Sequence, residues 1–278
     1  MAQQKIPTVR LRSGVAVPRI GLGTWPLTGS EGVEAVASAL DLGYRLLDTA
    51  ENYRNEDAVG QAVRESSVPR ENIVVTTKFN KEWHSIDGVR EVLSRSLDAL
   101  GLDYVDILLI HWPNPGHGRY VHAFEGMLAV QEDGLVRSVG TSNFLPTHLD
   151  VLASEGYIPE INQIQLDPLR PRNDVVAYMR ENGIVGECWS PLGKAQGELL
   201  EREELQAVAD AHGVTPAQVV LRWEIQRGLV PIPKSASRER QAENLDVFGF
   251  ELSEEEMQAV DSLEDPQAKI DDPDRFGH

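Results

Sequence analysis

Four ionisable side chains fall at or just beyond predicted strand ends in the first half of the chain. The segment Arg45–Asp48 ends in a carboxylate, and Tyr53 follows five residues later in the loop. The next two predicted strands end in Lys78 and His111. Taken singly, such groups are more often structural, for example an aspartate that accepts backbone hydrogen bonds. Their occurrence at three successive strand ends favours a shared site, because titratable groups with perturbed pKa values cluster at active sites.

These residue types suit proton donation to a carbonyl oxygen. A tyrosine is a weak acid with an ordinary pKa of about 10. The ammonium of Lys78 is expected to lower the pKa of Tyr53 by favouring the phenolate, and Asp48 is expected to pair with Lys78. His111 is expected to hydrogen-bond the same carbonyl oxygen and orient it. A carbonyl group that accepts a hydride needs such a donor and needs no nucleophile.

A metal-dependent hydrolase is the main alternative for these residues. Such an enzyme needs several His and Asp ligands, commonly in close pairs. The seven histidines are scattered along the chain, and His117 and His122 lie in or after a loop without obvious partners. The sequence therefore predicts no metal.

Strand and helix patterns alternate along the chain. Eight segments, nearly continuous in apolar residues, are each followed by a segment with helical spacing. Such strands are typical of a parallel sheet covered by helices. The predicted strands are Arg19–Gly23, Arg45–Asp48, Ile73–Lys78, Val105–His111, Val136–Ser142, Ile161–Leu166, Ile184–Trp189 and Leu229–Pro233.

Eight strand–helix units predict an α/β fold, a (β/α)8 TIM barrel that forms a single domain over residues 1–278. Thr8–Leu11 and Val15–Val17 flank a glycine turn and predict an N-terminal β-hairpin, and extra helices are expected near the C-terminus. A doubly wound sheet would need G-x-G-x-x-G at the first strand-to-helix turn, but Gly21–Pro26 lacks the third glycine. In a barrel, the chemistry lies at the carboxyl ends of the strands.

The composition restricts the partners. A net charge of −18 disfavours nucleic acid. No segment approaches the roughly 20 apolar residues of a membrane helix, and Met1–Arg10 lacks the pattern of a signal peptide, so we expect no membrane association. The single cysteine, Cys188, excludes an internal disulfide and fits the reducing cytoplasm.

A basic cluster stands out against the acidic background. Lys234, Arg238 and Arg240 lie just past the last predicted strand, where the next helix begins. Lys and Arg side chains and a helix start suit a phosphate, and barrel phosphate sites often form after strands seven and eight. A solvated basic helix turn is the alternative reading.

Over nearly its whole length, from Gly21 to Leu245, the chain resembles the aldo-keto reductase family. It is most similar to bacterial 2,5-diketo-D-gluconate reductases and related members with short loops. Seven family motifs occur in order, each at a strand end. They are Asp48–Glu56, Thr77–Lys78, Ile110–Pro113, Gly140–Phe144, Asn162–Gln163, Ser190–Leu192 and Ile232–Ser235.

The resemblance implies an NADP-dependent oxidoreductase that binds NADPH in an extended pose and reduces a small-molecule carbonyl substrate. It implies a catalytic tetrad of Asp48, Tyr53, Lys78 and His111, with Tyr53 as proton donor. The residues implied to bind the nicotinamide are Ser142, Asn143, Gln163 and Trp189, the last by stacking. Those implied to bind the phosphates and adenosine are Ser190, Leu192, Lys234, Ser235, Arg240, Glu243 and Asn244. Gly23, Thr24 and Trp25 are also expected in the cofactor site.

The substrate is less determined than the reaction. Pocket walls in this fold come from the loops after the strands and from the C-terminal tail, and the aromatic wall candidates are Trp25, Phe79, Trp83 and Trp112. An aromatic wall accepts many small carbonyl compounds, such as dicarbonyls or keto sugars. Asp167 departs from the family pattern, where many relatives have histidine, and this puts the packing beneath the nicotinamide in doubt.

A second hypothesis from a different class is a cofactor-binding regulatory subunit with little turnover. The complete tetrad argues against it. We further expect a monomer.

Overall fold

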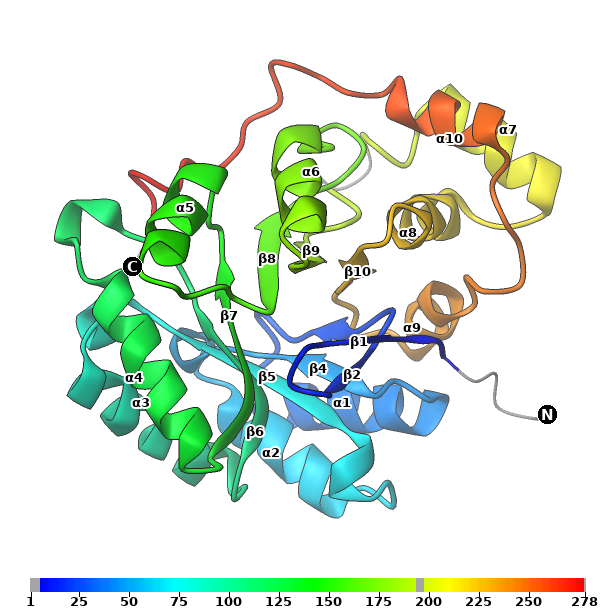
Figure 1. The fold of residues 1–278 in the computed structure, drawn as a ribbon. Coiled ribbons are helices and arrows are strands. Elements are labelled where there is room, and N and C mark those ends of the chain that lie inside the picture. The colour runs from blue at the N-terminus through cyan, green and yellow to red at the C-terminus, as the bar shows by residue number, and fades with distance from the viewer. Residues whose placement is uncertain (1–5, 194–197, 278) are drawn as a thin grey trace.

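The computed structural model describes residues 6–193 and 198–277. Eight parallel strands curl into a barrel with helices on its outer side (Figure 1). They coincide with the eight predicted strands to within a few residues. They are β3 (Leu22–Gly23), β4 (Leu46–Asp48), β5 (Val74–Phe79), β6 (Val105–Ile110), β7 (Val136–Ser142), β8 (Ile161–Gln165), β9 (Val185–Trp189) and β10 (Val230–Pro231).

The two edges of the sheet meet and close the barrel. Between β3 and β10, each strand is hydrogen-bonded to the next in chain order. The backbone N–H of Gly21 donates to the carbonyl of Pro231 at 3.0 Å, and that of Gly23 donates to the carbonyl of Pro233 at 3.1 Å. A Cβ at Gly23 would lie 2.8 Å from the carbonyl oxygen of Ile232, so this closure needs a glycine. The predicted (β/α)8 barrel is confirmed.

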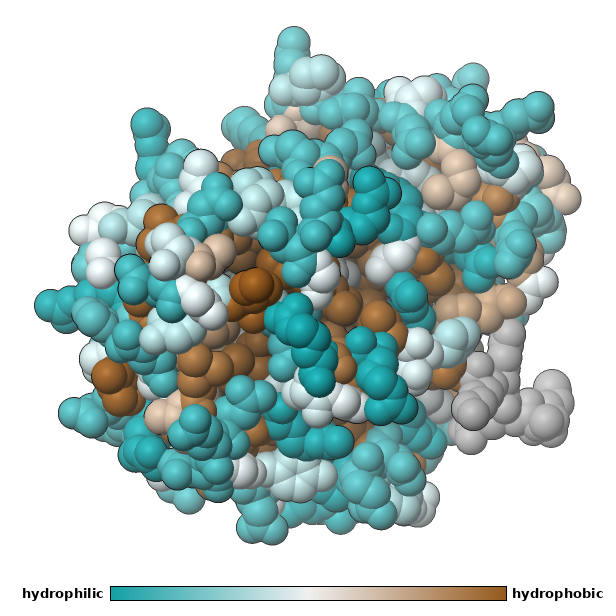
Figure 2. All heavy atoms as spheres, viewed as in Figure 1, coloured by the Kyte–Doolittle hydropathy of each residue, from teal (hydrophilic) through white to brown (hydrophobic). Residues whose placement is uncertain are grey.

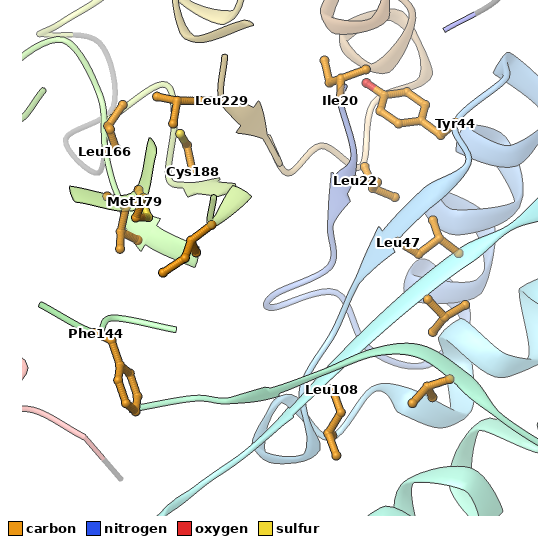
Figure 3. Close-up of a cluster of buried hydrophobic side chains, with 14 of the residues drawn as sticks. Ile20, Leu22, Tyr44, Leu47, Leu108, Phe144, Leu166, Met179, Cys188 and Leu229 are labelled. Atoms are coloured by element: carbon orange, nitrogen blue, oxygen red, sulfur yellow. The ribbon is translucent and has the colours of Figure 1, made fainter. Parts of the chain in front are cut away.

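Strand side chains alternate between two apolar cores, as the pleat requires. On β6, Leu108 belongs to an outer core between strands and helices, while Ile107 and Leu109 belong to an inner core inside the barrel. Figure 3 shows part of the outer core, including Leu47, Leu108 and Cys188.

A β-hairpin closes one end of the inner core. The predicted hairpin is present as β1 (Thr8–Arg10) and β2 (Ala16–Pro18), which pair antiparallel. Leu11, Val15 and Val17 of this hairpin pack with inner-core residues of the barrel strands. The other end of the interior is therefore left for polar side chains.

The same alternation places polar residues in the interior at the carboxyl ends of the strands. Each lies two or four residues beyond an inner-core member of its own strand, and so shares its side of the sheet. The pairs are Leu46 and Asp48, Val74 and Lys78, Leu109 and His111, and Ile161 and Gln163.

Amphipathic helices cover the barrel, and they bury their apolar sides in the outer core. Their outer surface is largely hydrophilic on the face shown in Figure 2, in line with the net charge of −18. The helices are α1 (Gly29–Leu42), α2 (Glu56–Glu65), α3 (Ile86–Leu100), α4 (Tyr120–Glu132), α5 (Pro146–Ser154), α6 (Asn173–Glu181), α7 (Glu203–His212), α8 (Pro216–Gln226), α9 (Arg238–Leu245) and α10 (Glu254–Asp261).

The C-terminal part carries the expected extra helices. Both α7 and α8 lie between β9 and β10, and α10 follows α9. The helix α10 starts with a capping box, in which Ser253 and Glu256 each bond the other's backbone N–H. Beyond α10, an irregular tail runs back toward α5 (Figure 1). Within the described residues, no helix has the length and apolarity to cross a bilayer.

Candidate active site

Lys78 stands at the centre of the candidate site. Its side chain is fully buried, and its ammonium lies 2.7 Å from Oδ2 of Asp48 and 3.0 Å from the carbonyl oxygen of Thr49. The same nitrogen lies 3.4 Å from the hydroxyl of Tyr53. The structure therefore brings together three of the four predicted tetrad residues by direct contacts.

His111 lies beside Tyr53. The two ring centroids are 5.7 Å apart in an edge-on arrangement. His111 is 7 % exposed, and its backbone N–H donates to the carbonyl of Phe79 at 2.9 Å, which continues the pairing of β5 with β6. The imidazole is thus the fourth member of a cluster that includes the Tyr53 phenol.

A buried asparagine fixes the loop that carries Tyr53. Tyr53 ends a short 3-10 helix, Glu51–Tyr53. Two residues on, Asn55 accepts a bond from the Thr49 hydroxyl at 2.6 Å and donates to the carbonyls of Leu27 at 2.8 Å and Thr24 at 3.1 Å. The loop is therefore hydrogen-bonded to the residues that follow β3 and β4.

Burial dominates the acidity of Tyr53. Removal of the phenol from water raises its pKa above the ordinary value of 10.0, Lys78 opposes this, and Asp48 adds to it. The prediction that Lys78 lowers the pKa of Tyr53 overall is wrong. The ammonium does act to lower this pKa, but burial raises it by more. At neutral pH the phenol is therefore protonated and available as a donor.

Lys78 keeps its proton despite being buried. Burial alone would lower its pKa, but Asp48 and Tyr53 together outweigh burial and raise the pKa above 10.5. A positive charge thus lies next to the Tyr53 oxygen, and such a charge favours the phenolate form of tyrosine.

The residues expected around a nicotinamide form a second hydrogen-bonded group against the tetrad. The Ser142 hydroxyl donates to the carbonyl of Gln163 at 3.0 Å. The Asn143 amide donates to the carbonyl of His111 at 3.0 Å and to the Ser142 hydroxyl at 3.1 Å. The indole of Trp189 donates to the Asn143 side-chain oxygen at 2.8 Å. These four predicted residues lie together, three at or just after the ends of β7 and β9 and Gln163 in the middle of β8.

The basic residues expected at the phosphates remain available to a ligand. Lys234 and Arg240 are exposed, and neither has an ion pair within the described part of the chain. The start of α9 is ordered by Ser237, whose hydroxyl accepts from the Arg240 N–H at 3.3 Å and which itself donates its N–H to the Ser235 hydroxyl at 3.1 Å. Exposed cations at an ordered helix start fit an anionic phosphate.

Other predicted cofactor residues have structural partners. Glu243 accepts a bond from the hydroxyl of Thr215 at 2.8 Å, and Asn244 is buried. The hydroxyl of Thr24 donates to the backbone carbonyl of Asp48 at 2.8 Å. Leu192 packs against the outer core, and Ser190 has a left-handed backbone with φ of 52°.

The predicted substrate walls differ in exposure. Trp25 is 61 % exposed and free to contact a ligand, whereas Phe79 is 1 % exposed and belongs to the outer core, where it packs edge-on against His84. Phe79 points from β5 toward the helices, and therefore it does not line an exposed wall of the substrate pocket. Trp83 is half-buried, with the guanidinium of Arg95 4.7 Å from its ring centroid.

The C-terminal tail reaches the same region, as expected, although the sequence did not indicate which of its residues would do so. The ring of Phe276 lies 4.8 Å from that of Trp112, and the Lys81 ammonium lies 3.4 Å from the carbonyl of Gly277. Nδ1 of His148 accepts the Leu145 N–H, so Nε2 carries the hydrogen and donates to Asp274 at 2.8 Å. The sequence of the tail has no periodic pattern that predicts these contacts, because they depend on where the barrel places α5 and β6.

Asp167 has a local structural role. It is fully buried, and its carboxylate lies 2.5 Å from the guanidinium of Arg170 and accepts the Leu169 N–H at 2.9 Å. The aspartate thus closes the turn that follows β8. At the position where many relatives have histidine, this chain therefore has an ion pair within the turn.

The comparisons with known proteins agree with this geometry. Residues 19–265 match the family model described as Aldo/keto reductase family. The chain is 48 % identical over 270 residues to 2,5-diketo-D-gluconic acid reductase B of Corynebacterium sp., covering 97 % of each chain. It is 41 % identical over 273 residues to methylglyoxal reductase DkgA of Escherichia coli, covering 98 % of each.

A solved structure extends the likeness to a nucleotide complex. A crystal structure of a Gox0644 mutant in complex with NADPH superposes with a TM-score of 0.92 at 35 % identity, over 98 % of this chain and 99 % of that one. Sequence, fold and site geometry thus converge. The chain belongs to the aldo/keto reductase family, whose members reduce carbonyl groups with NADPH, and it is an oxidoreductase of that kind.

Proposed function

We propose that Tyr53 is the proton donor in NADPH-dependent reduction of small aldehydes and ketones, with Lys78, Asp48 and His111 as its partners. The observation that carries this proposal is the position of the Lys78 ammonium, 3.4 Å from the Tyr53 hydroxyl and 2.7 Å from Asp48. NADPH supplies the hydride to the carbonyl carbon.

The chain's own residues handle the proton. Tyr53 gives its proton to the carbonyl oxygen as that oxygen becomes an alkoxide, and the resulting phenolate takes a proton back from water. Lys78 stabilises the phenolate electrostatically, and Asp48 keeps the ammonium in place. His111, beside the Tyr53 ring, hydrogen-bonds the carbonyl oxygen and orients it.

Replacement of the phenol tests this assignment. In Tyr53→Phe we expect kcat for carbonyl reduction to fall by about two to four orders of magnitude, since a positioned acid contributes about that factor. The matched control is Tyr178→Phe, because the Tyr178 hydroxyl bonds Asp150 on the outer helices. Undiminished turnover in Tyr53→Phe would remove Tyr53 from the donor role.

We further propose that Lys234 and Arg240 bind the 2′-phosphate of NADPH. Their exposure without ion pairs in the described residues supports this. In Lys234→Ala and Arg240→Ala, the preference for NADPH over NADH should shrink about tenfold each, measured as the ratio of kcat/KM values.

Arg238→Ala is the matched control for the phosphate site. Its guanidinium is already engaged by the hydroxyl of Ser38 on α1, at 3.2 Å. Removing this third basic side chain of the same helix turn should leave the preference intact. Equal use of NADH and NADPH by the unaltered protein would contradict the phosphate site.

For the substrate, we propose small dicarbonyls and keto sugars, such as methylglyoxal and 2,5-diketo-D-gluconate. The names of two relatives motivate this choice. Comparison of kcat/KM over a panel of aldehydes, ketones and keto sugars tests it. If none of these compounds is turned over while NADPH binds, the alternative of a cofactor-binding regulatory subunit gains support.

We also propose that the protein is a cytoplasmic, single-domain monomer without affinity for nucleic acid. The net charge of −18 supports the last point. Light scattering on a size-exclusion column and a salt-dependent DNA-binding assay test the oligomeric state and the nucleic-acid point.

A further inference from the structure

Glu187 is a fully buried glutamate inside the barrel that no step of the proposed reaction uses. It lies on β9, two residues before Trp189, and therefore on the same side of the strand. Its Oε2 accepts a hydrogen bond from the side-chain nitrogen of Gln163 at 3.0 Å. Its Oε1 has no hydrogen-bond partner in the described residues.

Gln163 donates both of its amide hydrogens to carboxyl groups. The second hydrogen bond runs to Oδ1 of Asp48 at 2.7 Å. Asp48 lies on β4, which is four places from β8 in the strand order, so this bond spans the barrel interior. The Asp48 carboxylate, which pairs with Lys78, can only accept, so the amide nitrogen faces the two carboxyl groups and Gln163 keeps only its carbonyl oxygen for a ligand.

A continuous chain of contacts therefore links Glu187 to the phenol. It runs from Glu187 to Gln163 at 3.0 Å, to Asp48 at 2.7 Å, and to Lys78 at 2.7 Å. The Lys78 ammonium then lies 3.4 Å from the Tyr53 hydroxyl. A leucine in place of Glu187 would fill similar space but would leave a buried Gln163 N–H without an acceptor, which is unfavourable.

We propose that Glu187 is a positioning residue that fixes the side-chain amide of Gln163 and, through it, the carboxylate of Asp48 that holds Lys78. This inference rests on the proposed role of the tetrad. It assigns to Glu187 no contact with substrate or cofactor.

The charge state of Glu187 fits this role. Burial and the nearby Asp48 raise the pKa of Glu187 to about 8, while the Gln163 bond and Lys78 oppose the rise. At pH 7 Glu187 is thus a neutral acid, and it adds no second negative charge beside the Asp48–Lys78 pair. Above pH 8 its ionisation would disfavour the Tyr53 phenolate and so weaken Tyr53 as an acid.

Two variants separate the hydrogen bond from the charge. Glu187→Gln keeps an acceptor oxygen for Gln163 but cannot ionise, whereas Glu187→Leu removes the acceptor. The control is Glu224→Gln, another fully buried glutamate. Its carboxyl oxygens have no hydrogen-bond partner in the described residues, and it lies on α8 outside the chain of contacts.

Two measurements then apply to each folded variant. Quenching of tryptophan fluorescence gives the Kd for NADPH without turnover, and single-turnover reduction gives the chemical rate as a function of pH. In Glu187→Leu we expect Kd to rise and the rate to fall, each about tenfold, as for one lost buried hydrogen bond. Glu187→Gln should recover most of both losses, and Glu224→Gln should change neither.

The pH profile is the readout that a purely structural role would not move. In the unaltered protein the single-turnover rate should decrease as pH rises through about 8, and Glu187→Gln should lack this step. Persistence of the step in Glu187→Gln, or unchanged Kd and rate in Glu187→Leu, would overturn the proposal. If Glu187→Leu does not fold, the pH profile of the single-turnover rate in Glu187→Gln alone tests the proposal.

Failure of this proposal is distinguishable from failure of the proposed function. Tyr53→Phe would then still abolish reduction while both Glu187 variants behaved as the unaltered protein. If Tyr53→Phe were active, the tetrad assignment itself would be wrong, whatever the Glu187 variants show.

Discussion

The indole N–H of Trp189 donates a 2.8 Å hydrogen bond to the side-chain oxygen of Asn143. The nitrogen of the same Asn143 side chain donates to the carbonyl of His111 and to the Ser142 hydroxyl. The amide is thereby held at both ends, with a backbone φ of 64° that itself favours Asn. A tyrosine or phenylalanine at position 189 would lack an indole donor for Asn143.

We therefore predict that Trp189→Phe weakens NADPH binding, because the substitution removes the hydrogen bond that holds the Asn143 side chain. The freed Asn143 amide should raise the Kd for NADPH about three- to tenfold, as for one hydrogen bond of about 1 kcal/mol. Isothermal titration of the apoprotein with NADPH measures this. Trp223→Phe is the control, since its indole bonds Asp261 in the outer layer and its loss should reduce stability only. An unchanged Kd in Trp189→Phe would argue against this positioning role.

The buried pair of Asp48 and Lys78 makes a separate prediction about stability. Lys78→Met leaves Asp48 as an uncompensated buried charge, and removal of one partner of such a pair costs about 3–5 kcal/mol. The double variant Asp48→Asn with Lys78→Met should recover part of that loss, because no lone charge remains. Urea unfolding at pH 7 measures both.

Activity should not follow stability in this pair. The double variant has no ammonium beside Tyr53, so its kcat should stay as low as that of Lys78→Met. Equal unfolding free energies for the single and double variants would show that the pair is not coupled in the way its 2.7 Å contact indicates.

Much of this architecture could be predicted from the sequence because the strands of a parallel barrel are short, nearly continuous apolar segments. The segment Val105–His111 is apolar and short, and it ends in a histidine, so both the strand and the position of His111 at its carboxyl end follow from the pattern. The hairpin could be predicted because Gly14 lies in a turn between two short strand segments.

Other features need the three-dimensional placement of distant segments. The role of Glu187 could have been suspected from alternation, since a residue two before an inward Trp189 must also point inward. Its bond to Gln163 depends on the barrel interior, and the position of Phe79 in the outer core depends on the phase of β5. The pKa of Tyr53 could not be judged from Lys78 alone, because burial outweighs that neighbour.

Buried carboxyls predict how stability depends on pH. The pKa of Glu187 is raised from 4.5 to about 8 in the folded protein, so the folded state holds a proton there that the unfolded state loses. This contribution is complete below pH 4.5 and is lost as pH rises toward 8. Glu187→Gln should therefore gain stability relative to the unaltered protein across this window, by at most about 1.4 kcal/mol per pH unit.

Urea unfolding at pH 5.5 and 7.5 would measure this gain. The control is Glu132→Gln, because Glu132 is exposed at the end of α4. A stability difference for Glu187→Gln that is equal at both pH values would mean that Glu187 is ionised in the folded protein at neutral pH.

The C-terminal tail leads to a prediction about the substrate. Phe276 is 42 % exposed and packs on Trp112, which in turn stacks on His111 with ring centroids 6.4 Å apart. Removing the ring in Phe276→Ala opens the wall over this end of the site while leaving the tetrad and the basic cluster untouched. We expect KM for aromatic dicarbonyls such as phenylglyoxal to rise several-fold, with the Kd for NADPH unchanged. Ile270→Ala, an exposed apolar residue earlier in the same tail, is the control and should change neither constant. If Phe276→Ala instead weakened NADPH binding, the tail would belong to the cofactor site, because a substrate wall alone has no reason to alter the affinity for nucleotide.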